Sequence, residues 1–329
     1  MKPGGKLALA FFGLLAGCWL ALSPVLAQEE EEGWQVSAKS FVIMDAKTGQ
    51  ILLSLNPQMF WPPASTLKVM TALAVVQHLK MDDPVPVSDY AASAPPSKIK
   101  IKPGESYTVR EMLYALLLSS ANDAARALAE KVSGSEEEFA RQTTREVRQM
   151  GAYRTTLATA NGLPADNQFS TAEDLAKLFR KAMENPELAK IMQTKYYTLK
   201  GDRELRNHNR FLFTTPLAVA GKTGFTRASK HTYVGMFQKD DKAIIVSMMG
   251  SSKKWADLRP LIEKGFELEG TPIAKLPPAE EKLFFGKNGA VTIAARKSKR
   301  TRVVMGSAGC IHKKKSLSRK KSRPKEEDT

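Results

Sequence analysis

The sequence predicts an α+β domain in which strands from both ends of the domain form one antiparallel sheet, flanked by helices that include a helical subdomain. β-Rich runs occur at 40–56 and again at 217–250, whereas the segment between them is dominated by the three-to-four-residue apolar spacing of amphipathic helices. With 329 residues, 43% of them hydrophobic, the chain is long enough to bury a substantial core. Strands at both ends of a helical middle favour a shared sheet with helices packed beside it.

Each element is expected from a local pattern. Residues 40–56 are typical of a β-hairpin that turns at Ala-Lys-Thr-Gly, and Pro62 and Pro63 stop any earlier helix, so that one helix is expected from Ser65 to Lys80. Further helices are expected at 109–118, 122–132, 135–150 and 171–184, antiparallel strands at 217–226, 231–237 and 242–250, and a closing helix at 256–267.

The first 27 residues are typical of a secretory signal peptide. Lys2 and Lys6 precede an apolar stretch that ends at Leu22, and small residues lead to a cleavage point after Ala27. Two alternatives stay open: an uncleaved membrane anchor, because about 20 apolar residues span a bilayer, and a lipoprotein signal ending in LAGC at Cys18. Each of them predicts an exported protein, periplasmic or otherwise extracytoplasmic, and no disulfide framework.

Composition divides the rest of the chain. We expect an acidic linker at 28–33, the folded domain at 34–267, a linker with a short β segment at 268–312 and a disordered basic tail at 313–329. The four histidines and two cysteines are dispersed along the sequence, so no metal site is expected, and no cofactor is predicted. A phosphate-binding loop at 216–223 is excluded, because its first glycine is replaced by Pro216.

Three short motifs carry the candidate chemistry. Ser65 and Lys68 are three apart in a mostly apolar run, so the amine can reach the hydroxyl, and desolvation disfavours its charged form. Ser120 and Asn122 stand between two apolar helical runs. Taken singly, each motif has a structural explanation, namely a helix cap with a snorkelling lysine or ordinary capping.

The third motif is Lys222-Thr223-Gly224, and the same tripeptide occurs at 47–49. The early copy is explained by the turn of the hairpin, where Gly49 suits a positive φ. The late copy stands inside a strand, where a glycine is unfavourable unless another group approaches the backbone closely. A ligand lying along that strand is the functional reason.

Ser-x-x-Lys, Ser-x-Asn and Lys-Thr-Gly, in this order, form the motif set of β-lactamases and penicillin-binding proteins. With PPASTLKVMTAL, LLLSSANDAA, NGLPADNQFSTAEDLA and AGKTGFT around them, residues from about Ser40 to Phe266 resemble the low-molecular-weight penicillin-binding proteins, the serine-type D-alanyl-D-alanine carboxypeptidases. The resemblance implies a β-lactamase/transpeptidase-like fold. It also implies removal of the terminal D-alanine from peptidoglycan stem peptides through an acyl-enzyme, with β-lactams as covalent inhibitors.

The resemblance also implies a role for each motif residue. Ser65 would be the acylated nucleophile, Lys68 its general base and Ser120 a relay that passes a proton to the leaving amine. Asn122 would hold the substrate amide, Lys222 and Thr223 the terminal carboxylate, and the main chain at Gly224 the peptide as an added strand. The backbone N–H groups of Ser65 and Phe225 would form the oxyanion hole.

The chain departs from the family pattern at several points. Ala121 and His231 stand where smaller residues are common, and the arginine that assists carboxylate binding has no clear match. Lys253, Lys254 and Arg259 are the candidates to replace it. Residues 267–329 are too few for both the β-rich C-terminal domain and the membrane helix of many members.

Three other functions stay open. A D,D-endopeptidase acting on cross-linked peptidoglycan uses the same motifs, a β-lactamase needs a deacylating glutamate with no suitable match after Ser120, and a non-catalytic penicillin sensor would not need its reactive side chains intact. The net charge of +16 is concentrated in residues 296–329, which hold thirteen Lys and Arg against three acidic residues. This tail suits contact with anionic membrane lipids or wall polymers, or has no partner; nucleic acid is not expected.

Overall fold

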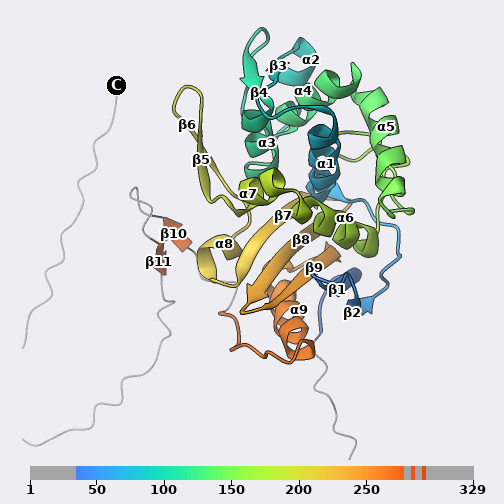
Figure 1. The fold of residues 1–329 in the computed structure, drawn as a ribbon, viewed down its shortest axis with the longest axis vertical. Helices are drawn as coiled ribbons and strands as arrows, with labels where there is room; N and C mark the ends of the chain where they lie inside the picture. Colours follow the sequence, from blue (N-terminus) through green and yellow to red (C-terminus); the bar gives the residue numbers. More distant parts are fainter. Residues whose placement is uncertain (1–34, 278–282, 286–290, 294–329) are drawn as a thin grey trace, which may run out of the picture. The chain divides into compact units, whose positions relative to one another are not determined.

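The computed structural model describes residues 35–277, 283–285 and 291–293 (Figure 1). The expected signal peptide at 1–27, the acidic linker at 28–33, both cysteines and the basic tail at 313–329 lie outside the described residues. The chain divides into one unit that ends at Ala279 and a second that begins at Glu280. Within the described ranges, no helix combines the length and the apolar character needed to cross a membrane.

The first unit is built on a five-stranded antiparallel sheet with the strand order β2-β1-β9-β8-β7. Its strands are β1 (Ser40–Asp45), β2 (Ile51–Leu55), β7 (Ala218–Thr226), β8 (Lys230–Lys239) and β9 (Lys242–Ser251). β1 pairs with β9 in a register that sets Val42 opposite Ser247. Strands from both ends of the domain therefore share one sheet, which confirms the predicted α+β architecture. The strand that carries the third motif, β7, lies at its edge.

A hydrophobic core covers each face of the sheet. On one face, Ile43 of β1 packs in a cluster with Leu261 and Phe266 of helix α9 (Lys254–Leu268). On the other, Val42 belongs to a larger core that contains Phe179 of α6 (Ala172–Glu184). Figure 1 shows α6 and α9 on opposite sides of the strands. Because both faces are covered, the central strands are apolar on both sides.

Helices α3 (Val109–Leu118), α4 (Asn122–Ser133) and α5 (Glu136–Gln149) form the helical part of this unit together with α1 (Lys68–His78), which packs against all three. Capping residues set their ends: Thr108 and Glu111 form a capping box, Gly134 ends α4 with a φ of 79°, and Ser135 caps α5. The predicted helices at 109–118, 122–132, 135–150 and 171–184 are confirmed to within about one residue at each end.

Several short elements have no counterpart in the prediction, because each is held by its neighbours rather than by a long periodic pattern. They are β3 (Pro84–Pro86), α2 (Asp89–Ala92), β4 (Ser106–Thr108), α7 (Pro186–Gln193), β5 (Tyr196–Leu199), β6 (Arg203–Arg206) and α8 (Phe211–Thr214). In the second unit, β10 (Leu283–Phe285) pairs with β11 (Val291–Ile293), and both lie in the segment expected to contain a short β element.

The single helix expected from Ser65 is wrong in detail. Residues Ala64–Leu67 form a 3-10 helix, η1, and the α-helix α1 begins only at Lys68. The tighter turn follows from the backbone at Ala64, whose φ is +50°, and from hydroxyls that hold this turn. Those of Thr66 and Thr232 both donate to the carbonyl of Pro63, at 2.6 and 2.8 Å. The nucleophile candidate therefore lies in a turn that is fixed from both sides.

Candidate active site

Three segments that are distant in the sequence bring polar side chains together beside the edge strand. η1 and the first residue of α1 supply Ser65 and Lys68, the α3–α4 junction supplies Ser120 and Asn122, and β7 supplies Lys222. Hydrogen bonds join Ser65 to Lys68, Lys68 to Asn122, and Lys222 to Ser120. The structure thus places the five predicted side chains in two hydrogen-bonded groups, one of three residues (Ser65, Lys68 and Asn122) and one of two (Ser120 and Lys222).

Lys68 is fully buried and has three hydrogen-bond partners. Its Nζ lies 3.1 Å from Ser65 Oγ, 2.8 Å from Asn122 Oδ1 and 2.5 Å from the carbonyl oxygen of Asn161. Asn122 Oδ1 and the Asn161 carbonyl can only accept, so they fix two hydrogens of the amine. In the neutral amine, the remaining lone pair then points to the Ser65 hydroxyl.

Burial pushes the pKa of Lys68 well below its ordinary value, and the positive charge of Lys222 lowers it further. Glu136 and Asp123 act in the opposite direction, because their negative charges favour the protonated amine. Burial is the larger effect, so the neutral form of Lys68, the one that can accept a proton, is favoured.

The α3–α4 junction presents Ser120 in a left-handed backbone conformation with φ of +59°. Ser120 is 6% exposed, and its Oγ accepts a hydrogen bond of 2.9 Å from Lys222 Nζ, which leaves the hydroxyl hydrogen free to donate. Asn122 uses both ends of its carboxamide: Oδ1 accepts from Lys68, and Nδ2 donates to the carbonyls of Pro95 and Pro96, each at 3.0 Å. Binding a substrate amide through Asn122 would require exchange of one of these partners.

On β7, Lys222 is 1% exposed and Thr223 is 9% exposed. Burial, followed by the positive charge of Lys254, lowers the pKa of Lys222 to about 7. Nζ of Lys222 also donates to the carbonyl of Thr223 at 3.0 Å. The ammonium of Lys222 therefore donates to two neutral acceptors. Because neither acceptor is charged, the positive charge of Lys222 is available to bind an anionic group.

Two glycines let backbone segments approach η1 closely. A Cβ on Gly224 would lie 2.3 Å from Thr232 Oγ1 and 2.9 Å from the backbone nitrogen of Ser65. A Cβ on Gly162 would lie 2.0 Å from the carbonyl oxygen of Ala64, and Gly162 has a φ of +81°. Both positions exclude a side chain. The sequence predicted that another group approaches the backbone closely at Gly224. In the structure this group is the turn that carries Ser65.

Phe225 follows directly on β7 and is 57% exposed. Its ring lies 4.6 Å from the ring of His231, its register partner on β8. The strand therefore becomes exposed immediately after Gly224, and the rings of Phe225 and His231 lie at this boundary.

Sequence reasoning missed the part played by the 160–162 loop. Asn161 contributes its carbonyl oxygen, a group that every residue has, so no side-chain pattern marks it. Glu136, which contacts this loop, stands in the acidic run 136–138, where a solvated helix start is the ordinary expectation.

Among the three cations proposed to replace the missing arginine, Lys254 is the one whose charge acts on Lys222. Burial, and then the charge of Arg210, lowers the pKa of Lys254 to about 8, and its Nζ lies 4.4 Å from the centre of the Trp255 ring. Lys253 is exposed, and Arg259 donates to the Trp255 carbonyl.

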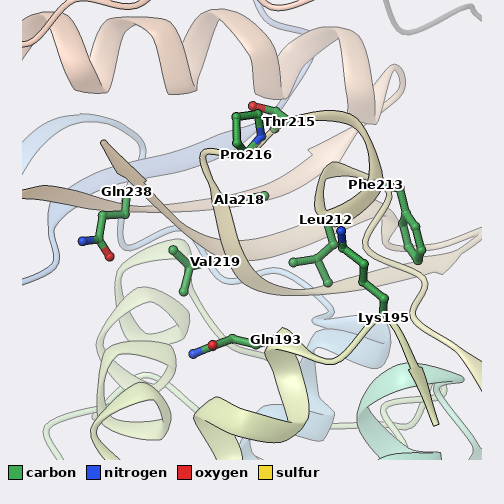
Figure 2. A pocket seen from close by; sticks show the side chains of 9 residues that line it. All are labelled: Gln193, Lys195, Leu212, Phe213, Thr215, Pro216, Ala218, Val219 and Gln238. Carbon is green, nitrogen blue, oxygen red and sulfur yellow. The ribbon is translucent and has the colours of Figure 1, made fainter. Parts of the chain in front are cut away.

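A separate cavity of about 660 Å³ lies along the first residues of β7 (Figure 2). It is lined by Gln193, Lys195, Leu212, Phe213, Thr215, Pro216, Ala218, Val219 and Gln238. None of these is a predicted site residue, and Lys195 is the one charged side chain among them. The hydroxyl and amine chemistry therefore belongs to the cluster around Ser65 and not to this cavity.

A buried amine paired with a hydroxyl, beside the edge of an antiparallel sheet, defines a serine hydrolase that works by acyl transfer. The model of the D-alanyl-D-alanine carboxypeptidase family matches residues 26–253. The chain belongs to this family, a family of penicillin-binding serine peptidases, and the resemblance seen in the sequence is confirmed.

Comparisons with individual relatives support the same family. The chain is 34% identical over 243 residues to D-alanyl-D-alanine carboxypeptidase DacB2 of Mycobacterium tuberculosis, covering 70% of this chain and 83% of the relative. Among solved structures, a D-alanyl-D-alanine carboxypeptidase from the same organism has a TM-score of 0.69 at 30% identity, covering 74% of this chain and 96% of that one. A Streptomyces DD-transpeptidase has a TM-score of 0.67 at 26% identity, covering 71% and 99%. These similarities confirm the transpeptidase-like fold.

Proposed function

We propose that the cluster around Ser65 removes the terminal D-alanine from peptidoglycan stem peptides. The observation that carries this proposal is the 3.1 Å contact between Lys68 Nζ and Ser65 Oγ, made by an amine whose other partners are two acceptors. Lys68 takes the hydroxyl proton as Ser65 Oγ forms a bond with the carbonyl carbon of the penultimate residue. The oxyanion is received by the backbone N–H groups of Ser65 and Phe225.

Collapse of this intermediate breaks the peptide bond to the terminal D-alanine. Ser120, held by Lys222, donates its hydroxyl proton to the leaving nitrogen, and the proton is replaced through the neighbouring amines. Water then attacks the ester on Ser65 and releases the shortened peptide. A β-lactam amide acylates the same oxygen by the first of these steps.

Substrate orientation comes from β7. Lys222 and Thr223 receive the terminal carboxylate, with Lys254 as the second cation, and the peptide pairs with the strand near Gly224 as an added strand. Asn122 holds the substrate amide after exchange of one proline carbonyl. An extracytoplasmic place of action fits this substrate and the composition of residues 1–27. The contact of the basic tail with anionic lipids or wall polymers stays a prediction.

The proposal is tested on purified muropeptides. We expect D-alanine release from uncross-linked pentapeptides and a bound fluorescent penicillin that persists for minutes or longer. Cleavage of cross-linked dimers without D-alanine release would identify an endopeptidase, and rapid turnover of penicillin would identify a β-lactamase. Either result would overturn the carboxypeptidase assignment, as would transfer of the acyl group to amine acceptors in place of water.

The fall in activity expected above neutral pH follows from Lys222. Since the pKa of Lys222 is lowered to about 7, its ammonium is lost as the pH rises through that value, and kcat/KM for a peptide with a free C-terminal carboxylate should fall there. Lys222→Arg keeps the charge and should remove this fall, and a C-terminal amide substrate, which has no carboxylate to bind, should show a smaller one. A profile that is flat above pH ~7 for the unaltered enzyme would contradict this role of Lys222.

A further inference from the structure

A buried carboxylate, Glu136, lies behind the amine of Lys68 and is not part of the motif set. Glu136 begins α5 and is 8% exposed. Its Oε1 accepts from the backbone N–H of Ala160 at 2.8 Å and from Asn161 Nδ2 at 3.2 Å. Oε1 of Glu136 thus holds the loop that contains Asn161. The backbone carbonyl of Asn161 in turn accepts a hydrogen bond from the Lys68 amine.

The second oxygen of Glu136 is fixed from the other side. Oε2 accepts from the hydroxyl of Tyr90 at 2.5 Å and lies 3.3 Å from Arg126 Nε. Arg126 in turn stacks on the Tyr90 ring, with its Cζ 4.1 Å from the ring centre. The carboxylate therefore cannot rotate away from the loop without losing an ion pair and a hydrogen bond.

Other contacts also hold the loop near Asn161. Thr71 Oγ1 of α1 donates to the Ala160 carbonyl at 2.6 Å, which fixes the next peptide group, between Ala160 and Asn161. The side chain of Asn161 otherwise accepts from the N–H of Leu163. The direction of the Asn161 carbonyl, and with it one hydrogen of the Lys68 amine, is therefore set by Glu136 together with Thr159, whose Oγ1 accepts from the N–H of Gly162 at 3.0 Å.

We propose that Glu136 is a positioning residue for the acylation step: its carboxylate clamps Ala160 and Asn161, so that the Asn161 carbonyl orients the Lys68 amine toward Ser65. This inference rests on the proposed role of Lys68 as the base. Glu136 has a second effect through its charge, because it opposes the depression of the Lys68 pKa by burial. The other charged groups that act on Lys68 are Lys222 on β7 and Asp123 on α4, and His208 responds to it.

The two effects are separated by two variants of the full-length chain, in which the rate of acylation by a penicillin is measured against pH. Glu136→Gln keeps an acceptor for the loop and removes the charge. The pKa of Lys68 then falls, and the acid limb of the profile should move to lower pH. Asn161→Ala keeps the charge and its own carbonyl but loses the side-chain half of the clamp, the bond from Asn161 Nδ2 to Glu136. The acid limb should stay, and the plateau rate should fall by about tenfold, because the base is no longer aligned.

Glu137→Gln is the matched control. Glu137 is the next residue of α5, its side chain is 82% exposed, and it pairs with Arg141 on the surface. Its profile should overlay that of the unaltered enzyme. The positioning role is overturned if Asn161→Ala leaves the plateau within about twofold of this control, and the charge effect is overturned if Glu136→Gln leaves the acid limb in place.

Melting temperatures of all variants establish that they are folded. If Glu136→Gln does not fold, Asn161→Ala decides alone, since a plateau equal to the control overturns the proposal. Lys68→Ala separates this inference from the proposed function: retained acylation there would remove Lys68 as the base, whatever the Glu136 variants show. Loss of acylation in Lys68→Ala with unchanged Glu136 and Asn161 variants would leave the function intact and reject the clamp.

Discussion

Replacing Ser65 by alanine is expected to abolish covalent penicillin labelling and to lower D-alanine release by more than about 10⁴-fold. The reason is that the hydroxyl oxygen is the atom that becomes acylated, and among the described residues no other hydroxyl is hydrogen-bonded to the Lys68 amine. The measurement is mass spectrometry of the intact chain after exposure to penicillin, together with a D-alanine assay. Mass spectrometry also reads the N-terminus and so tests cleavage after Ala27.

The fold should survive this change. Ser65 is half-buried, and within the described residues its hydroxyl is hydrogen-bonded to Lys68, so its loss leaves the turn at Ala64–Leu67 in place. A variant that melts like the unaltered chain and still carries a penicilloyl adduct would remove Ser65 from the mechanism.

Lys222→Ala is expected to lower kcat/KM by about 10² to 10³-fold, since it removes a preorganised donor to the substrate carboxylate and the partner of Ser120. The two losses affect different kinetic constants. KM should rise because carboxylate binding is lost, and kcat should fall because the leaving nitrogen is protonated less efficiently.

The chain contains its own control for this prediction. Lys47 occupies the same position in the early Lys-Thr-Gly copy, where Thr48 donates to Asp45, Gly49 has a φ of +80° and Arg180 binds the Lys47 carbonyl. These contacts do not use the Lys47 side chain, so Lys47→Ala should keep full activity. Equal losses in the two variants would mean that Lys222 acts through stability and not through the substrate.

The reliable part of the sequence prediction was what local patterns determine. The apolar spacing of 109–118 and the capping box at Thr108 lie within one helix, so its bounds were predictable from neighbouring residues alone. The motif residues could be chosen because Ser65, Lys68 and Lys222 have side chains whose chemistry is specific. The identity of the family followed from their order.

What the sequence could not predict depends on contacts between distant segments. The 3-10 turn at Ser65 is held by Thr232, 169 residues from the carbonyl that it binds at Pro63. The Asn161 group that accepts from Lys68 is a backbone carbonyl. The carbonyls of Pro95 and Pro96, which accept from Asn122, belong to a loop with no regular pattern. Glu136 resembles its exposed neighbours in sequence and differs from them only in the fold.

The position of β7 at the sheet edge has a consequence for the behaviour of the protein in a crowded compartment. An unpaired strand edge invites pairing with the edge of another protein and so promotes aggregation. Here the backbone of Ser65 stands so close to Gly224 that a β-carbon would not fit, so η1 covers one face of this stretch, whereas its hydrogen-bonding edge has no strand partner within the described residues. The edge proposed to receive the substrate is thus also one of the two edges of this sheet at which such pairing can occur.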